Sequence, residues 1–191
     1  MPDRLFLAVR PPAAVVADLA AYVEPRRDSD PALRWAHPEH WHLTLAFLGG
    51  VDDDRCDRLV EYLEFVAAGS EPFHVELAGA GSFPHPDAAR ALWLGVGQGA
   101  AELGHLATRC RTAAGRAGIP VEGRRFQGHL TLARSNRGLH ARRWLEVVSS
   151  FGPFGWRVAD FVLIESELTR GGPRHRISRR FDLTGDERML R

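Results

Sequence analysis

The chain has 191 residues, of which 45% are hydrophobic and 26% charged, an ordinary balance for a globular protein with a substantial core. It contains no apolar run long enough to span a membrane, and its first ten residues hold too short an apolar stretch for a signal peptide, so we expect a cytoplasmic protein. The net charge of +1 says nothing by itself about nucleic acid.

The distribution of charge and of cysteine is more informative than the total. All 25 positively charged residues are arginine, whose planar guanidinium suits bidentate contacts to phosphate. Acidic residues concentrate over 52–64 and arginines over 124–143 and 170–180, an asymmetry that allows a basic cleft, although most of these arginines individually fit a solvated surface. The two cysteines, Cys56 and Cys110, exclude a four-thiolate zinc site, and no disulfide is expected in a reducing compartment.

Hydrophobic periodicity and turn residues divide the first part of the chain into short elements. Asp52 is expected to cap a helix, and Gly49-Gly50 to end the strand before it. In chain order the expected elements are a strand over 4–9, a helix over 11–22, a loop over 25–31, strands over 33–36 and 41–48, and a helix over 52–68.

The same patterns divide the second part of the chain into short helices and strands. Gly81 is expected in a loop between two strands, and Gly118 to close a helix. The expected elements are strands over 73–80 and 91–96, a helix over 99–117, a strand over 125–134, a helix over 140–149, a strand with a bulge over 156–168, and a strand over 176–183.

This order resembles a duplicated α+β unit more than a regular βαβ alternation. We therefore expect a single domain over 1–191 with a duplicated, two-lobe α+β fold. In this fold, antiparallel sheets line a central cleft and helices cover the outside.

The tetrapeptide His-Leu-Thr-Leu occurs twice, at residues 42–45 and 129–132, once in each half of the chain. Residues i and i+2 of a strand share a face, so each copy presents an imidazole and a hydroxyl side by side, backed by core leucines. A single copy would fit a strand with one solvated face. Two copies favour a site made of four side chains: His42, Thr44, His129 and Thr131.

Two histidines and two hydroxyls suit the cleavage of a phosphodiester without a metal or cofactor. A neutral imidazole can accept a proton from water while an imidazolium gives one to the leaving oxygen. Threonine hydroxyls can hold the non-bridging phosphate oxygens. The competing interpretation is a metal site at His37, Glu39, His40 and His42, but the spacing matches no common zinc pattern and leaves the second tetrapeptide unexplained.

Aromatic and basic residues near the motifs are further candidates for contact with substrate. Trp35, Phe83, Trp93 and Phe126 could stack bases, although core packing is the usual role of such residues. Phe126 is the strongest exception because it precedes His129 by three residues. Arg134 is a second candidate substrate contact, although a regular strand would point it away from the face that holds His129 and Thr131.

The two motifs and their flanks resemble the two-histidine (2H) phosphoesterase superfamily, which is defined by paired HxTx motifs. More specifically, the chain resembles the bacterial and archaeal RNA 2′,3′-cyclic phosphodiesterase branch, also described as RNA 2′,5′-ligase. The segments that carry it are Arg4-Leu5-Phe6-Leu7-Ala8-Val9, His42-Leu43-Thr44-Leu45-Ala46-Phe47-Leu48-Gly49, Leu92-Trp93-Leu94-Gly95, His129-Leu130-Thr131-Leu132-Ala133-Arg134, Leu163-Ile164-Glu165-Ser166-Glu167-Leu168 and Gly171-Gly172.

The resemblance implies two pseudo-symmetric lobes, one HxTx motif in each, with histidines that face each other across a cleft. It implies hydrolysis of RNA 2′,3′-cyclic phosphate ends to 2′-phosphomonoesters. It implies His42 as proton donor to O3′, His129 as proton acceptor from water, and phosphate held by Thr44 and Thr131. Relatives often have proline where this chain has Gly128, and tyrosine near Pro173-Arg174-His175. The expected partners are RNA ends or cyclic nucleotides, bound by a monomer without a membrane.

Two other functions remain open from the sequence. One is a 2H hydrolase of another small cyclic phosphate or of a 2′,5′-linked oligonucleotide. The other is a non-catalytic module that binds RNA or nucleotides, against which the complete set of histidines and threonines in both motifs argues. Reversible 2′,5′-ligation of RNA is compatible with hydrolysis of RNA ends, and the identical motifs do not say which histidine is the acid.

Overall fold

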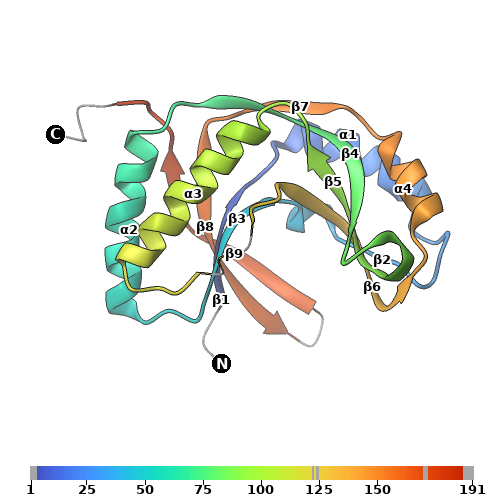
Figure 1. The fold of residues 1–191 in the computed structure, drawn as a ribbon, viewed down its shortest axis with the longest axis horizontal. Helices are drawn as coiled ribbons and strands as arrows, with labels where there is room; N and C mark the ends of the chain where they lie inside the picture. The colour runs from blue at the N-terminus through green and yellow to red at the C-terminus, as the bar shows by residue number, and fades with distance from the viewer. Residues whose placement is uncertain (1–3, 122, 124, 170–171, 187–191) are drawn as a thin grey trace.

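The computed structural model describes residues 4–121, 123, 125–169 and 172–186. Figure 1 shows the strands curling into an open half-barrel with helices on its outside. The elements are β1 (Arg4–Val9), α1 (Ala13–Val23), η1 (Glu24–Arg26), β2 (Arg34–Trp35), η2 (Pro38–His40), β3 (Leu43–Gly49), α2 (Asp53–Ala68), β4 (Phe73–Phe83), η3 (Pro86–Ala88), β5 (Ala89–Val96), α3 (Ala100–Arg116), β6 (His129–Leu139), α4 (Arg142–Ser149), β7 (Phe154–Val158), β8 (Asp160–Thr169) and β9 (Gly172–Asp182).

The strands form one antiparallel sheet in the order β7-β4-β5-β6-β3-β1-β8-β9, with β2 paired to β6. The expected α+β class with antiparallel pairing is confirmed, but the two expected sheets are continuous. They join between β3 and β6 through a single aligned pair, Leu43 and Leu130. Each half of the sheet therefore carries one of the two motif strands.

Each half of the sheet has its own pair of helices. Helices α2 and α3 pack together beside β3 and β9, and helices α1 and α4 pack against β7, β4 and β5 (Figure 1). The two halves of the sheet are not the two halves of the chain, because the late strands β8 and β9 extend the half that begins with β1. The pseudo-two-fold relation between the halves stays a prediction.

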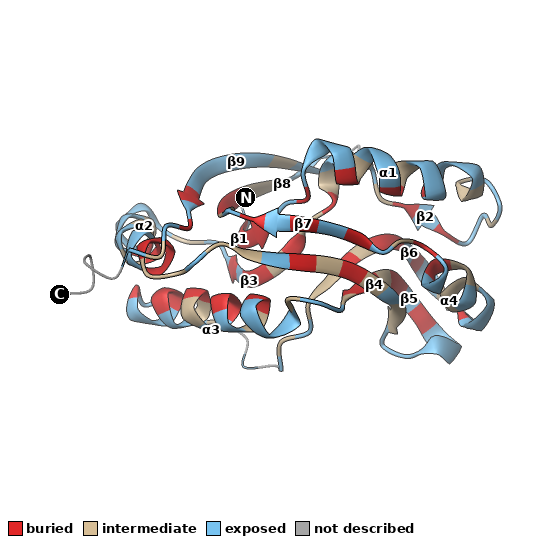
Figure 2. Cartoon of the chain, turned by 90° about the horizontal axis from the view of Figure 1, so that it is seen from above, coloured by how far each residue is buried: buried red, intermediate tan, exposed pale blue. Residues whose placement is uncertain are grey.

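The main core lies between the sheet and the helices, where buried residues form stripes on the inner sides of α1 and α3 (Figure 2). The opposite face of β1 and β8 carries a second, small apolar cluster of Phe6, Ala8, Val162 and Ile164. Burial on both faces explains why β1 is apolar along almost its whole length. In the part of the chain that the structure describes, no helix is long and apolar enough to cross a membrane.

Two helix starts show how the sequence fixes local structure. The Asp52 carboxylate accepts a hydrogen bond of 2.9 Å from the Arg55 backbone N–H, and so caps α2 as expected. Gly99 precedes α3 with φ at 78°, and a Cβ there would lie 2.1 Å from the His74 carbonyl oxygen. Only glycine fits both the left-handed conformation and this close approach to β4.

The single strand expected over 156–168 is wrong. The chain forms two strands there, interrupted at Ala159: β7 pairs with β4 at one edge of the sheet, whereas β8 pairs with β1 and β9 in the other half. The change in apolar alternation that suggests a bulge is instead the point where the chain crosses between halves. Alternation reports which face is buried and carries no information about the pairing partner.

The loop expected around Gly81 is also wrong, because β4 continues through it to Phe83. Gly81 pairs with Trp93 on β5, and a Cβ at Gly81 would lie 2.1 Å from the indole ring of Trp93. The glycine therefore makes room for a cross-strand tryptophan, a role that differs from a turn.

Candidate active site

The motif strands meet where the two halves of the sheet join. Leu43 of β3 and Leu130 of β6 are aligned across this junction, and both are fully buried in the main core. Residues on either side of an aligned pair point to the opposite face of the sheet. Four side chains, all partly buried, are thereby brought together on that face: His42, Thr44, His129 and Thr131.

The antiparallel register also sets their arrangement. Extending it by one residue on each side of the leucine pair puts His42 across from Thr131 and Thr44 across from His129. The two histidines then lie on one diagonal of a small quadrilateral and the two threonines on the other. A phosphate above the leucine pair would have an imidazole and a hydroxyl on each side.

Both histidines are held in the same tautomer. The Nδ1 atom of His42 lies 2.6 Å from the His40 carbonyl oxygen, and Nδ1 of His129 lies 2.7 Å from the Gln127 carbonyl oxygen. A carbonyl oxygen can only accept, so each Nδ1 must carry the hydrogen and donate it. Each Nε2 is therefore left to exchange protons with a bound molecule.

The site favours neutral imidazoles in the absence of a bound anion. Burial lowers the pKa of His42 from 6.5 to about 4, against the opposing effect of the hydrogen bond to the His40 carbonyl. Positive charge on His175, Arg10 and His129 lowers that pKa further. Burial also lowers the pKa of His129, opposed by the Gln127 carbonyl and reinforced by Arg134.

Aromatic rings flank both histidines. The ring of Phe6 lies 4.9 Å from that of His42, and the ring of Phe83 lies 4.9 Å from that of His129. His175 on β9 stands 5.2 Å from Phe6 and 5.7 Å from His42 by ring centroids. His175 thus puts a third imidazole beside the first motif.

A bulge changes the direction of side chains beyond the second motif. On β6, Thr131 aligns with Trp93 but Ala133 aligns with Leu92, so one residue is inserted, and Leu132 and Ala133 are both buried. The insertion returns Arg134 to the face that holds His129 and Thr131. The expectation that Arg134 points away is therefore wrong, because it holds only for a regular strand.

The first motif strand has the same irregularity. Thr44 aligns with Ala8 but Ala46 aligns with Leu7, and Leu45 and Ala46 are both buried. Phe47 then takes the position that corresponds to Arg134 in the second motif. It is 66% exposed, with its ring 6.1 Å from that of Phe6.

Arg134 contributes to a pocket of 380 Å³ beside the second motif. Its lining residues are Phe83, Pro84, Arg90, Ala91, His129, Thr131 and Arg134. The sequence gives no reason to single out Arg90, because nothing near it in the chain carries a motif. Its only signal is spatial: β5 pairs with β6, and Ala91, the next residue, aligns with Arg134.

Phe126, the other candidate substrate contact, is not brought into this pocket. It packs against the core, with the guanidinium carbon of Arg111 on α3 lying 5.5 Å from its ring centroid. A Cβ at Gly128 would lie 3.0 Å from Leu103, 3.3 Å from Val96 and 3.5 Å from Phe126. A side chain before His129 would therefore need Leu103 or Val96 to move by a few tenths of an ångström.

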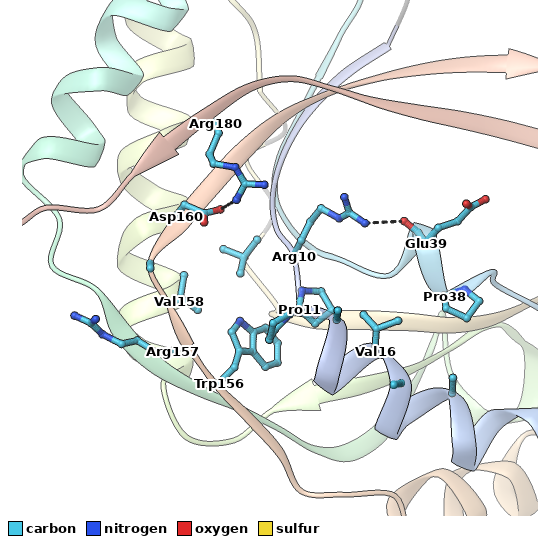
Figure 3. A pocket seen from close by; sticks show the side chains of 16 residues that line it. Arg10, Pro11, Val16, Pro38, Glu39, Trp156, Arg157, Val158, Asp160 and Arg180 are labelled. Atoms are coloured by element: carbon cyan, nitrogen blue, oxygen red, sulfur yellow. Dashed lines mark hydrogen bonds and ion pairs between the residues drawn. The ribbon is translucent and has the colours of Figure 1, made fainter.

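A larger pocket of 560 Å³ lies away from the motif pair, between α1, η2 and the turn from β7 to β8 (Figure 3). Two of its arginines already have partners: Arg180 pairs with Asp160 at 2.7 Å, and Arg10 donates to the Glu39 carbonyl oxygen at 3.2 Å. Size alone therefore does not identify the reactive site.

The histidine cluster considered as a metal site is arranged differently from a ligand set. Nδ1 of His42 is engaged by the His40 carbonyl, and the ring of His40 lies 4.6 Å from that of His175. Within the described ranges, no group of three or more His, Cys, Asp or Glu side chains could hold a metal ion.

The sequence resembles known proteins along most of its length. The sequence matches the 2′-5′ RNA ligase superfamily over residues 11–170. It is 31% identical to the RNA 2′,3′-cyclic phosphodiesterase of Aquifex aeolicus (strain VF5) over 161 residues, which cover 80% of this chain and 82% of that protein. It is 32% identical to the protein of that name from Escherichia coli (strain K12) over 193 residues, covering 96% and 98%.

The fold is likewise similar to solved structures along most of the chain. E. coli LigT complexed with 3′-AMP aligns with a TM-score of 0.80 and 28% identity, covering 96% of this chain and 99% of that one. TT0787 of Thermus thermophilus aligns with a TM-score of 0.74 and 27% identity, covering 96% and 99%. The chain therefore belongs to the 2′-5′ RNA ligase superfamily, the 2H phosphoesterase family that its two HxTx motifs predict.

Proposed function

We propose that this protein hydrolyses 2′,3′-cyclic phosphate ends of RNA to 2′-phosphomonoesters by acid–base catalysis between two histidines. The observation that carries the proposal is the matched pair of imidazoles, each with Nδ1 bound to a backbone carbonyl and Nε2 available on one face. The relatives named RNA 2′,3′-cyclic phosphodiesterase, matched over most of their length, supply the substrate class.

The proposed reaction is an in-line displacement at phosphorus. His129 Nε2 accepts a proton from water as the water oxygen bonds to phosphorus, and the P–O3′ bond breaks opposite to it. His42 Nε2–H gives its proton to O3′, so the phosphate remains on O2′. Thr44 and Thr131 hold the non-bridging oxygens. If an RNA 5′-hydroxyl replaced water, the same steps would form a 2′,5′ linkage.

The assignment of His42 as the acid and His129 as the base comes from the family resemblance. A phosphodiester anion between the rings favours protonation, and so raises the pKa of whichever imidazole serves as the acid. Both histidines come from one chain, so we propose that a monomer suffices. The two free thiols, Cys56 and the buried Cys110, fit a cytoplasmic location.

Product analysis tests the proposal directly. We expect an oligonucleotide with a 2′,3′-cyclic phosphate end to yield a 2′-phosphomonoester, because His42 protonates O3′. Phosphorus NMR of the product distinguishes it from a 3′-phosphate, and a subsequent digestion with an enzyme specific for 3′-phosphate provides the control. A predominantly 3′-phosphate product would reverse the placement of the ribose, and no hydrolysis at all would reject the function.

Chelation tests the use of imidazoles as both acid and base. We expect full activity in EDTA, because proton transfer needs no metal-bound water when two imidazoles supply it. A metal-dependent phosphodiesterase in the same buffer serves as the control for complete chelation. Loss of activity that a divalent ion restores would contradict the mechanism.

A further inference from the structure

An apolar row crosses the reactive face of the sheet beside the first motif. Phe47 on β3 aligns with Phe6 on β1. Phe6 aligns in turn with Ile164 on β8, and Ile164 with Ile177 on β9, and aligned residues of neighbouring strands share a face. The ring of Phe6 lies 4.9 Å from that of His42, so this face is the one that holds the motif histidines. The middle of the row is buried, but Phe47 is 66% exposed at one end and Ile177 is 37% exposed at the other.

The apolar face continues along the arm that β8 and β9 form beyond this row. Ile164, Ser166 and Leu168 share one face of β8, because alternate residues of a regular strand do. Leu168 is 81% exposed, and Figure 1 shows the paired ends of β8 and β9 projecting from the body of the molecule. An exposed apolar surface that is continuous with a reactive site is typical of an interaction surface.

The charges of the arm are divided between its two faces. Glu165 precedes Ser166 and therefore points away from the reactive face, where it pairs with Arg176. Arg4 and His175 both align with Ser166 and lie on the reactive face. An apolar surface bordered by positive charge suits single-stranded nucleic acid, whose bases pack on apolar side chains while its phosphates remain near cations.

The proposed chemistry directs an RNA strand over this half of the sheet. His42 gives its proton to O3′, so the terminal ribose lies on the side of the first motif. From β3, which carries that motif, the sheet continues through β1 and β8 to β9. Nucleotides on the 5′ side of the terminal one can therefore cross the row toward Ile177. With strands ~4.8 Å apart, the row is roughly 14 Å wide, which exceeds the width of one base.

We propose that Ile177 and Leu168 form a docking surface for single-stranded RNA, on which the base that precedes the terminal nucleotide packs against Ile177. The inference rests on the proposed function, because that function places the terminal ribose. The surface contacts the apolar faces of bases and does not read their edges. It therefore selects single-stranded ends of any sequence over cyclic mononucleosides and over base-paired ends.

Two substrates of different length test the surface. Adenosine 2′,3′-cyclic phosphate and a trinucleotide with the same cyclic end differ in the bases that would reach the arm. We expect the wild-type kcat/KM to be about tenfold higher for the trinucleotide, and Ile177→Ser to lower the trinucleotide value about 3- to 10-fold, the scale for burying part of one aliphatic side chain. The value for the cyclic mononucleoside should stay the same, and the double variant with Leu168→Ser should lose most of the preference.

Phe65→Ser is the matched control, since Phe65 is 49% exposed on α2, a helix outside the sheet. Its ratio of kcat/KM values for the two substrates should equal that of the wild type. Ile177→Val should also keep most of the ratio, because valine remains apolar. Equal losses on both substrates in Ile177→Ser, or no change in the ratio, would overturn the surface.

A trinucleotide that lacks only its middle base separates base packing from phosphate charge, because it keeps every phosphate. On the wild-type protein it should lose about as much kcat/KM as Ile177→Ser causes with the intact trinucleotide. In Ile177→Ser the missing base should cost little more, since the two changes remove the same contact. A full preference for the trinucleotide without its middle base would assign that preference to charge and overturn the surface.

A second copy of the chain is the alternative occupant of the arm. Sedimentation velocity over a range of protein concentrations measures self-association. A dimer of the wild type that Ile177→Ser converts to a monomer would assign the apolar face to contact between copies, and would overturn the surface for RNA.

A binding measurement separates failure of the surface from failure of the proposed function. Calorimetry would compare adenosine 2′-phosphate with a trinucleotide that ends in a 2′-phosphate, neither of which needs turnover. We expect tighter binding of the trinucleotide by the wild type, and a smaller difference in Ile177→Ser. If no cyclic substrate is hydrolysed but this difference is present, the function fails and the surface stands. If both ligands bind equally, the surface fails.

Discussion

Replacing either motif histidine by alanine should lower kcat by roughly 10²–10⁴-fold, the usual contribution of a group that transfers a proton in the transition state. His42→Ala removes the proposed acid and His129→Ala the proposed base. The double variant should be little worse than either single one, because both groups act in the same step and removing one already disables it. Initial rates on a cyclic-phosphate oligonucleotide measure all three.

The fold should tolerate these changes, because neither imidazole belongs to the main core. Thermal unfolding of each variant checks this. His105→Ala provides a matched control, since His105 is exposed on α3 and belongs to neither motif. Full activity in either single motif variant would remove that histidine from the mechanism.

The threonines give a graded comparison within the same site. Thr44→Ala and Thr131→Ala each remove one hydroxyl that is proposed to hold a phosphate oxygen. A hydrogen bond to a charged group contributes about 1.5–3 kcal/mol, so we expect losses of roughly 10- to 100-fold, smaller than for the histidines. A threonine variant as impaired as the histidine variants would indicate a role in proton transfer.

Strand alternation is sufficient to predict which motif residues share a face. His and Thr two residues apart, with leucines between them, specify one polar and one buried face in each copy. The junction at Leu43 and Leu130 then brings the two polar faces together. The pairing of the two motif strands at that junction is not predictable, because a repeated tetrapeptide does not show whether its two copies lie on neighbouring strands.

The flanks of the site are harder to predict for a physical reason. A bulge inserts one residue and reverses the direction of every side chain beyond it. Each motif continues as Leu-Thr-Leu-Ala, and its two adjacent apolar residues fit a bulge as well as the end of a strand. Regular alternation therefore places Arg134 on the wrong face of the sheet. It also gives no reason to single out Phe47. Phe126 shows that closeness along the chain can also mislead. It is three residues from His129, but its ring packs against the core and does not reach the polar face.

The pH dependence of kcat/KM should have its maximum below pH 6.5. Catalysis needs one imidazole neutral and the other protonated, and kcat/KM reports the free enzyme. In the free protein the pKa of His42 is lowered from 6.5 to about 4, and that of His129 is also lowered. The singly protonated pair is therefore most abundant between two values that both lie below 6.5. Above them it declines about tenfold per pH unit, because the proton needed by the acid is lost.

The profile of kcat should lie at higher pH than that of kcat/KM, because the bound phosphodiester anion favours protonated imidazole and raises the pKa of the pair. Rates measured from about pH 4 to about pH 9, at low and at saturating substrate, separate the two profiles. Coincident profiles with a maximum above about pH 7 would contradict the role of burial.

Two variants connect the limbs of this profile with the charges around each ring. Positive charge on His175 lowers the pKa of His42, so His175→Gln should move the acidic limb of kcat/KM to higher pH. Arg134 lowers the pKa of His129, so Arg134→Gln should move the alkaline limb to higher pH and shift the acidic limb less. The pair titrates as a coupled unit, so the comparison rests on which limb moves further. Equal shifts of both limbs in both variants would mean that neither charge acts on one histidine selectively.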